Sequence, residues 1–208
     1  MPAGKREKMS QKKKLKIIQT TTQLLLKKGG SGSTSTTDIC SAAKFTRPTL
    51  YHYFGSKRNL LLSVHMESME KDLKPYLAEA ASIDDPLERL TYMVQTFTRE
   101  IICKRPELRV LIHDALTMKD KHFREVKGEW KKHYFLIRDT IAQLQSEGKA
   151  NAEVKPSWTA LFMLGMLTWV TYWFDYDRKD EVDQIADLAL QLVLHGLDLK
   201  DPAFRSPH

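Results

Sequence analysis

The stretch that decides the fold covers residues 34–57, where the chain runs TSTTDICSAAKFTRPTLYHYFGSK. Thr34 or Ser35 can cap a short helix, because hydroxyl oxygens accept hydrogen bonds from the first backbone N–H groups of a helix. A second short helix is predicted at about 47–53, since Thr46 is another N-cap candidate and a proline follows in the first helical turn, where it is tolerated. Two short helices this close together predict a helix-turn-helix.

Longer helices are expected on both sides of this motif. Apolar residues recur with helical spacing from Leu15 to Leu26, and the Gly29-Gly30 pair is typical of a helix end. After the motif, Ser56 is placed to cap a long helix from Lys57 to about Ala80.

The rest of the chain has the pattern of a helical bundle. No period-2 segment long enough for a strand occurs, and 9 glycines with 8 prolines are too few for a turn-rich β-fold. The sequence therefore predicts an all-α protein. Its further helices are expected at about 86–104, 106–117, 119–147, 156–175 and 181–197.

One helix has two interpretations. Residues 156–174 contain no charged side chain, and this segment is just long enough for a membrane span. Threonines and a glycine interrupt this segment, its tryptophans are spread along it, and the chain has no second candidate span. We therefore favour a helix buried partly in a bundle and partly by a second subunit, with no membrane partner.

The net charge of +7 is unevenly distributed along the chain. Residues 1–58 hold 13 Lys and Arg against 2 acidic residues, whereas residues 59–208 hold 20 basic and 24 acidic residues. A basic head on a mildly acidic body suits a protein that binds a polyanion, either nucleic acid or an anionic membrane surface. The alternative is a solvated lysine face with a disordered basic tail.

The remaining composition excludes several classes of protein. Cys40 and Cys103 are too few for a disulfide framework and are expected to be reduced and buried in a cytoplasmic protein. The lysine-rich beginning has no apolar core of a secretory signal. No nucleophile elbow, zinc-protease, P-loop or dinucleotide motif occurs, so we expect no enzyme, no cofactor and no metal site.

The motif resembles the DNA-binding domain of TetR-family transcriptional repressors over roughly residues 12–65. The resemblance combines the Thr/Ser cap, Ile39 with Ala43, the TLYHYF helix at 49–54, and Ser-Lys at 56–57 followed by NLLL. The turn glycine usual in the family is Lys44 here, which predicts a strained or shifted backbone at that turn.

The resemblance implies that the second short helix enters the major groove of double-stranded operator DNA with its N-terminal residues at the base edges. Arg47 stands at that end and is the candidate for reading guanine. Leu50 and Phe54 are expected to pack the small core instead. The full set of expected DNA-contacting residues is Thr37, Arg47, Pro48, Thr49, Tyr51, His52, Tyr53 and Lys57.

The resemblance also implies the organisation of the whole chain. A basic disordered arm (1–11) would precede the helix-turn-helix domain (12–56), and an effector-binding and dimerisation domain (57–200) would precede a C-terminal tail (201–208). A long helix would join the N-terminal three-helix domain to this ligand-binding bundle. The last two long helices would pair with those of a second copy, and the homodimer would bind a palindromic operator.

The effector is expected to be small and apolar. Residues 148–197 look like the C-terminal domain of a TetR subgroup that includes acyl-CoA-responsive regulators of lipid catabolism, which suggests an acyl chain or its CoA thioester. Aromatic, aliphatic and polar side chains on the middle helices are candidates for lining the pocket. They are Phe97, Arg109, Ile112, His113, Leu116, Trp130, Tyr134, Arg138, Phe162, Met166 and Trp169.

The function predicted from the sequence is therefore that of a sequence-specific transcriptional repressor released from its operator by an effector. The competing hypothesis is a basic helical protein that binds DNA without sequence preference, or lies on a membrane surface, and has no effector. Salt dependence and the specificity ratio for a palindrome would separate the two.

Overall fold

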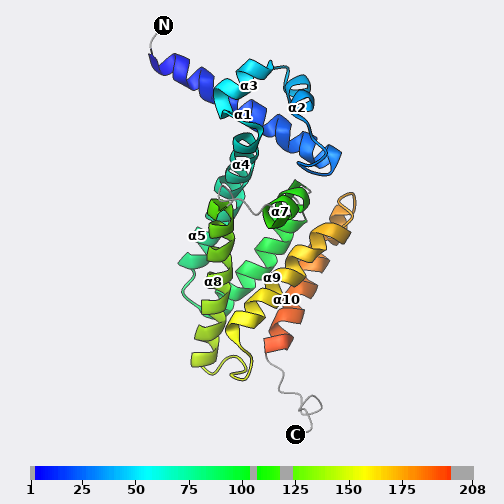
Figure 1. Ribbon diagram of the computed structural model, residues 1–208. Coiled ribbons are helices and arrows are strands. Elements are labelled where there is room, and N and C mark those ends of the chain that lie inside the picture. Colours follow the sequence, from blue (N-terminus) through cyan, green and yellow to red (C-terminus); the bar gives the residue numbers. More distant parts are fainter. Residues whose placement is uncertain (1–2, 104–106, 118–123, 198–208) are drawn as a thin grey trace. The chain divides into compact units, whose positions relative to one another are not determined.

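The computed structural model of the chain describes residues 3–103, 107–117 and 124–197, and these residues form helices and connecting turns only (Figure 1). The all-α prediction is confirmed. The chain divides into two compact units. Unit 1 comprises Met1–Lys71 with Glu107–Lys127, and unit 2 comprises Asp72–Pro106 with Gly128–His208.

Unit 1 is built from the basic part of the chain and one later helix. Its core includes Ile17, Leu25, Ile39, Leu50 and Leu60, each at most 1% exposed. These side chains come from successive helices, so the small helices are stabilised by packing rather than by their own length. The helices are α1 (Ala3–Lys28), α2 (Thr36–Ala43), α3 (Arg47–Phe54), α4 (Lys57–Ser68) and α7 (Glu107–Thr117).

Unit 2 is the larger helical bundle. Its core includes Leu90, Met93, Phe97, Ile137 and Ile141, none of which is exposed. Its helices are α5 (Lys74–Ser82), α6 (Pro86–Thr96), the π-helix η2 (Phe97–Ile102), most of α8 (Arg124–Ser146), α9 (Pro156–Trp173), the short 3₁₀ helix η4 (Lys179–Glu181) and α10 (Val182–Leu197).

The helix-turn-helix forms for local reasons that the sequence contains. Of the two cap candidates, Ser35 caps α2: its hydroxyl accepts a hydrogen bond from the Asp38 N–H (3.1 Å), and the Asp38 carboxylate accepts one from the Ser35 N–H (2.7 Å). Thr34 is buried and donates to the carbonyl of Gly30 instead (2.8 Å). Thr46 caps α3, as predicted.

The turn between α2 and α3 carries the expected backbone strain. Lys44 has φ 57° and ψ 44°, in the left-handed region, and it is the only residue other than glycine with positive φ in the described part of the chain. A side chain at such a position costs about 1–2 kcal/mol relative to ordinary backbone. The turn therefore keeps its left-handed geometry without the glycine that would make it inexpensive.

The basic arm expected at residues 1–11 differs from the structure, in which α1 already begins at Ala3. Residues 5–14 consist mostly of Lys, Arg, Glu, Gln and Met, which are strong helix formers, so the helix extends beyond the amphipathic stripe. The expected tail, residues 201–208, lies outside the described residues.

The long helix expected from Lys57 to Ala80 is interrupted. Between α4 and α5 the chain forms a π-helix, η1 (Met69–Leu73), and Pro75 stands at the start of α5. Proline has no N–H and its ring clashes with the carbonyl four residues earlier, so the preceding turn widens. A second π-helix, η2, replaces the end of the helix expected at 86–104.

The compact units differ from the predicted domain boundaries because α7 belongs to unit 1. Its side chains Leu108, Val110 and Leu111 are buried, and Val110 lies beside Gly30 at the end of α1. A Cβ on Gly30 would also approach the Asp114 carboxylate at 3.5 Å. These are ordinary contact distances, so it is the backbone of Gly30, with φ 128°, rather than a lack of space beside α7 that favours glycine at this turn.

The remaining structural predictions concern the two cysteines and the uncharged helix. Cys40 and Cys103 are both free and buried, as expected, and burial raises the pKa of the Cys103 thiol to about 11. Within the described residues no helix combines the length and apolarity that crossing a bilayer would need.

Candidate nucleic-acid interface and effector site

The short helix α3 has one buried and one exposed side. Leu50 and Phe54 are buried in the core of unit 1, which confirms their predicted structural role. Arg47, at the beginning of the helix, and Tyr51, one turn later, are exposed, and Tyr51 is 48% exposed. The exposed residues Pro48 and His52 complete this outward surface.

Arg47 joins the first turns of the two short helices. Its Nη2 donates a hydrogen bond to the hydroxyl of Thr37 on α2 at 2.6 Å, and both side chains are exposed. The structure thus brings together two residues that the sequence analysis selected separately. A guanidinium has five N–H donors, so this single bond leaves the group able to engage other acceptors.

The remaining α3 candidates differ in how much of their polar chemistry is already engaged. The Thr49 hydroxyl lies 2.9 Å from that of Thr46, so it belongs to the N-cap of the helix. His52 and Tyr53 pack edge to face, with ring centroids 5.3 Å apart, and Tyr53 is half-buried. Of these three, His52 is the most exposed.

Lys57 is bonded differently from what its expected phosphate contact implies. Its Nζ donates to the carbonyl of Ser31 at 2.9 Å, and the residue is half-buried. The ammonium therefore fixes the turn between α1 and α2 to the start of α4. Its two other N–H groups are what a phosphate contact would use.

The other side of the same turn is held by α7. The Ser31 N–H donates to Oδ2 of Asp114 at 3.3 Å, and Asp114 is only 5% exposed. Asp114 is not among the site residues predicted from the sequence. The available signal was an acidic residue one turn after the buried Val110 and Leu111, where the apolar pattern predicts a buried position.

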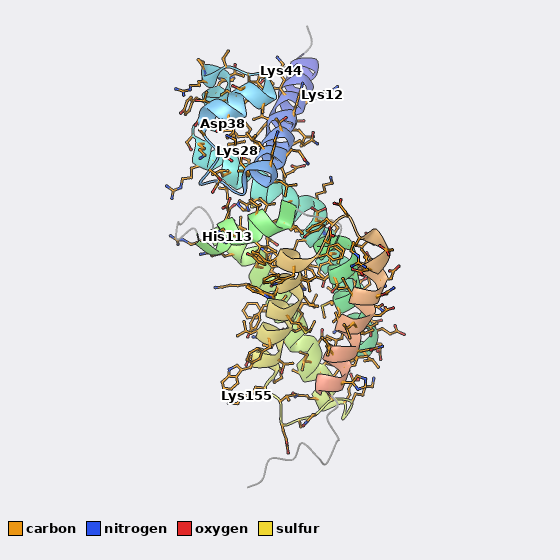
Figure 2. All side chains as sticks on the ribbon, turned by 90° about the vertical axis from the view of Figure 1, so that its right-hand side faces the viewer. Lys12, Lys28, Asp38, Lys44, His113 and Lys155 are labelled. Carbon is orange, nitrogen blue, oxygen red and sulfur yellow. The ribbon has the colours of Figure 1, made fainter. Side chains whose placement is uncertain are left out.

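Basic side chains of α1 lie beside this surface. Lys12, Lys13, Lys14 and Lys16 are exposed, and the ammonium of Lys14 lies 5.7 Å from the centre of the Phe54 ring. At the other end of the helix, Lys28 pairs with Asp38 at 2.7 Å (Figure 2). That ion pair and the bonds from Ser35 lower the pKa of Asp38 well below its ordinary value.

The predicted effector residues fall in both units. In unit 1, Ile112 is buried in α7 whereas His113 is exposed (Figure 2), and the side chains of Arg109 and Leu116 lie outside the described set. In unit 2, Phe97 is completely buried and meets Trp130 edge to face at 6.2 Å.

The other predicted effector residues in unit 2 are half-buried or exposed, with Tyr134 and Arg138 half-buried. Tyr134 packs on Phe135, and the Arg138 guanidinium lies over the Phe135 ring at 4.6 Å. Phe162, Met166 and Trp169 are exposed on α9, and Phe162 is 78% exposed. The structure therefore does not place these three beside Phe97 in the interior.

Two buried polar residues that the sequence analysis did not select lie beside Phe97. The Tyr76 hydroxyl lies 2.9 Å from Nε2 of His133 and 3.2 Å from the carbonyl of Met93. Burial lowers the pKa of His133 to about 3 and raises that of Tyr76 well above its ordinary value. The signal was available, because His133 falls on the apolar stripe of α8 with Val126, Ile137 and Ile141.

Exposed apolar side chains are concentrated on the last two long helices. On α9 and α10 they are Trp158, Leu161, Phe162, Met166, Trp169, Trp173, Leu188 and Leu192. Large exposed apolar surfaces on a protein commonly mark an interaction site. The uncharged stretch of sequence thus has one buried side, with Ala160, Met163 and Leu167, and one exposed side.

A groove of about 390 Å³ lies in unit 1 between α1 and α4. Its apolar lining comes from Leu15, Ile18, Leu62 and Met66, with Lys14 and glutamates at its rim. It contains none of the predicted effector residues. Among the described residues no group of three His, Cys, Asp or Glu could hold a metal ion.

Two family models match the chain. The model of bacterial regulatory proteins of the TetR family covers residues 17–64, and the model of the tetracycline repressor-like C-terminal domain covers residues 83–197. The chain belongs to the TetR family. The second match includes α7, so a helix from the C-terminal domain of this TetR-family protein packs with its DNA-binding helices.

Solved structures of other regulators share the TetR fold. PfmR from Thermus thermophilus has a TM-score of 0.76 at 22% identity, covering 88% of this chain and 98% of that one. AibR in complex with isovaleryl coenzyme A and operator DNA has 0.75 at 24%, covering 86% and 97%. FadR from Bacillus subtilis in complex with stearoyl-CoA has 0.72 at 16%, covering 88% and 98%. No curated protein matches the chain significantly.

Proposed function

We propose that this TetR-family regulator is a repressor that binds a palindromic operator as a homodimer and is released by a small apolar effector. The observation that carries the proposal is the surface of α3, which buries Leu50 and Phe54 while exposing Arg47 at its leading end. In a helix-turn-helix that end enters the major groove. A protein of this kind works where the DNA is, which places it in the cytoplasm.

Base readout is assigned to the beginning of α3. Arg47 presents a planar fork of donors, which suits the O6 and N7 acceptors of guanine, and its bond to Thr37 orients that fork. Pro48 and the methyl group of Thr49 offer apolar contact to a thymine methyl. These three residues are proposed to supply sequence preference.

Phosphate contacts are assigned to the surrounding polar side chains. Thr37, Tyr51, His52, Tyr53 and Lys57 would position the domain on the duplex without reading bases. The exposed lysines of α1 would add salt-sensitive affinity.

Dimerisation is assigned to the exposed apolar side of α9 and α10. Trp169 is 59% exposed and Trp173 is 74% exposed, and aromatic residues of this kind are enriched at protein interfaces. A second copy would bury these side chains in a twofold interface, and two recognition helices about one DNA turn apart would match a palindrome.

An acyl-CoA is the proposed class of effector. Two proteins with this fold have been seen with isovaleryl coenzyme A and with stearoyl-CoA, and those ligands belong to those proteins. In this chain, the interior of unit 2 around Phe97 and Trp130 offers an aromatic environment in which an acyl chain would be buried. Binding would release the operator only if the effector prefers the released conformation.

The deciding experiment selects binding sites from a pool of random duplexes with the purified protein. We expect an inverted repeat, bound at least about 10³-fold more tightly than a scrambled duplex at physiological salt. Saturating long-chain acyl-CoA should raise the Tm of the protein and lower its affinity for that repeat. Equal affinity for all duplexes would instead support the non-specific basic protein or, if anionic vesicles compete, the membrane-surface protein.

A further inference from the structure

The hydrogen bonds of Tyr76 determine which nitrogen of His133 carries the proton. The Met93 carbonyl is only an acceptor, so at 3.2 Å it takes the hydrogen of the Tyr76 hydroxyl. The Tyr76 oxygen must then accept in its second bond, at 2.9 Å from Nε2 of His133. Both contacts are hydrogen bonds together only in the Nε2–H tautomer, so we assign this tautomer to His133, which leaves a bare lone pair on Nδ1.

This lone pair is buried with nothing to satisfy it. His133 is 0% exposed, and its Nδ1 has no hydrogen-bond partner among the described residues. Burial lowers the pKa of the ring to about 3, so Nδ1 remains an acceptor at neutral pH. Buried acceptors normally have a donor, and an unsatisfied one requires an explanation such as a ligand.

The surroundings of His133 are aromatic. Its ring centroid lies 4.7 Å from that of Phe97, 5.2 Å from that of Tyr76 and 6.3 Å from that of Trp130. The hydroxyl of Thr98, the residue after Phe97, is also buried without a partner among the described residues. Both residues begin the π-helix η2, a form of helix that frequently occurs at functional sites.

We infer that Nδ1 of His133 is the polar recognition point of the effector site and selects an effector with an uncharged N–H or O–H donor on an apolar body. The inference rests on the proposed function and specifies its chemistry: an acyl-CoA would supply this donor from an amide N–H of its pantetheine arm, next to the thioester, and not from the acyl chain itself. A donor completes the bond that Nδ1 lacks. A carboxylate or an ester has only acceptor oxygens, whose lone pairs would face the lone pair of Nδ1 without a hydrogen between them. A carboxylate ion would also lose its hydration in an aromatic interior.

The first test compares four probes with the same alkyl chain: octanol, octanamide, methyl octanoate and sodium octanoate. The Tm of the full-length protein is measured at saturating probe. Octanol and octanamide should raise it by several degrees, whereas the ester and the carboxylate should leave it unchanged. Equal shifts for all four probes, or no shift with any of them, would overturn the inference.

Two matched variants separate recognition from packing. The amide N–H of a glutamine reaches the Nε2 position, so His133→Gln keeps the donor to Tyr76 but removes the Nδ1 acceptor. It should bind octanol about tenfold more weakly while keeping a near-normal Tm. An asparagine reaches the Nδ1 position, so His133→Asn should keep the donor preference and lose stability. The opposite pattern would show that His133 only packs.

A spectroscopic readout tests the tautomer without any ligand. The ¹⁵N chemical shifts of the His133 ring should show a protonated Nε2 and a bare Nδ1, and Nδ1 should shift when octanol binds. Selection of an operator from random duplexes is run on the same variants. If His133→Gln binds the operator normally but shows unchanged probe selectivity, the inference about Nδ1 fails while the proposed function as a repressor stands. If the unaltered protein selects no duplex, the proposed function fails while the probe series still tests the site.

Discussion

The carboxylate of Asp114, on α7, accepts a hydrogen bond from the backbone N–H of Ser31, a residue 83 positions earlier in the chain, at 3.3 Å. The carbonyl of the same Ser31 accepts a bond from Nζ of Lys57. One residue in the turn after α1 is thus held by α7 through its N–H and by the first turn of α4 through its carbonyl. These contacts give α7 a direct connection to the DNA-binding helices.

Asp114→Ala should lower the free energy of unfolding by about 1–3 kcal/mol, because the buried Ser31 N–H loses its acceptor. Operator affinity should also fall, since the turn that accepts from Lys57 is no longer held. Thermal denaturation and operator titration measure the two effects. Asp114→Asn keeps an acceptor oxygen and should be affected much less. Equal losses in both variants would mean that the negative charge, rather than the hydrogen bond, matters.

Arg47→Ala should weaken operator binding by about 1–3 kcal/mol and relax the preference at one base pair, because it would remove the bidentate contact to guanine proposed for Arg47. Binding to the operator and to each single-base variant of it gives the measurement. Arg178→Ala removes another exposed arginine, which lies in unit 2 and pairs with Glu181, and should change nothing. An equal loss on operator and scrambled duplexes would contradict base readout by Arg47.

Lys57→Ala should weaken binding to all duplexes by a similar factor, because the contact proposed for Lys57 is to a phosphate and not to a base. The bond to Ser31 adds an effect that the sequence alone did not predict: the variant should also unfold at a lower temperature. When the logarithm of the affinity is plotted against the logarithm of the salt concentration, the slope should be smaller by about one released ion. An unchanged slope would leave Lys57 with only its structural bond.

Lys44→Gly should stabilise the protein by about 0.5–1 kcal/mol, since glycine adopts the left-handed backbone of this turn without a Cβ penalty. Lys44→Ala is the control, because it removes the charge but keeps the penalty, and its stability should not rise. Urea denaturation of the two variants measures the difference. A gain with alanine as large as with glycine would show that the lysine charge, and not the backbone, is unfavourable.

Phe162→Asp together with Trp169→Asp should convert the proposed dimer into a monomer, because two carboxylates would be buried in an apolar interface. Sedimentation gives the mass, and affinity for the palindrome should fall more than affinity for a single half-site. Leu87→Asp alters a similarly exposed apolar residue on α6, 44% exposed, and should leave the mass unchanged. A dimer that persists with both aspartates would place the interface elsewhere.

The neutral state of His133 predicts a dependence of stability on pH. An unfolded histidine binds a proton near pH 6.5, whereas the folded pKa of His133 is about 3. Its contribution to stability is therefore complete above pH 6.5 and is lost as the pH falls toward 3, by up to about 1.4 kcal/mol per pH unit. Tm profiles from pH 7 to about 4 should be less steep for His133→Phe. Parallel profiles would show that other groups account for the slope, such as His65, whose pKa burial lowers to about 4.

The sequence predicted best what local rules decide. Ser35, Thr46 and Ser56 all cap the helices that their hydroxyls suggested, and Leu50 and Phe54 are buried, as expected. At Lys44 a strained or shifted backbone was predicted, and the structure has the strained alternative, with φ 57°.

Tertiary packing accounts for what the sequence did not predict. A carboxylate such as Asp114 finds its partner 83 residues away, which no local pattern encodes. The orientation of α9 could not be predicted either. A helix that is apolar on all sides has no polar side, so its sequence does not show which side faces the core. Phe162 and Trp169 were therefore expected in a pocket, whereas the structure exposes them. Pro75 was a local signal for the π-helix η1 that the sequence analysis overlooked.

The burial of Cys40 and Cys103 has a practical consequence. The chain contains 2 cysteines, and both are shielded from solvent, so thiol-reactive reagents should leave the native protein unmodified. A single new cysteine on the surface, such as Tyr51→Cys on α3, would then carry a spin label or fluorophore alone. In the proposed dimer, a pair of such labels would report the distance between the two α3 helices directly, with and without effector.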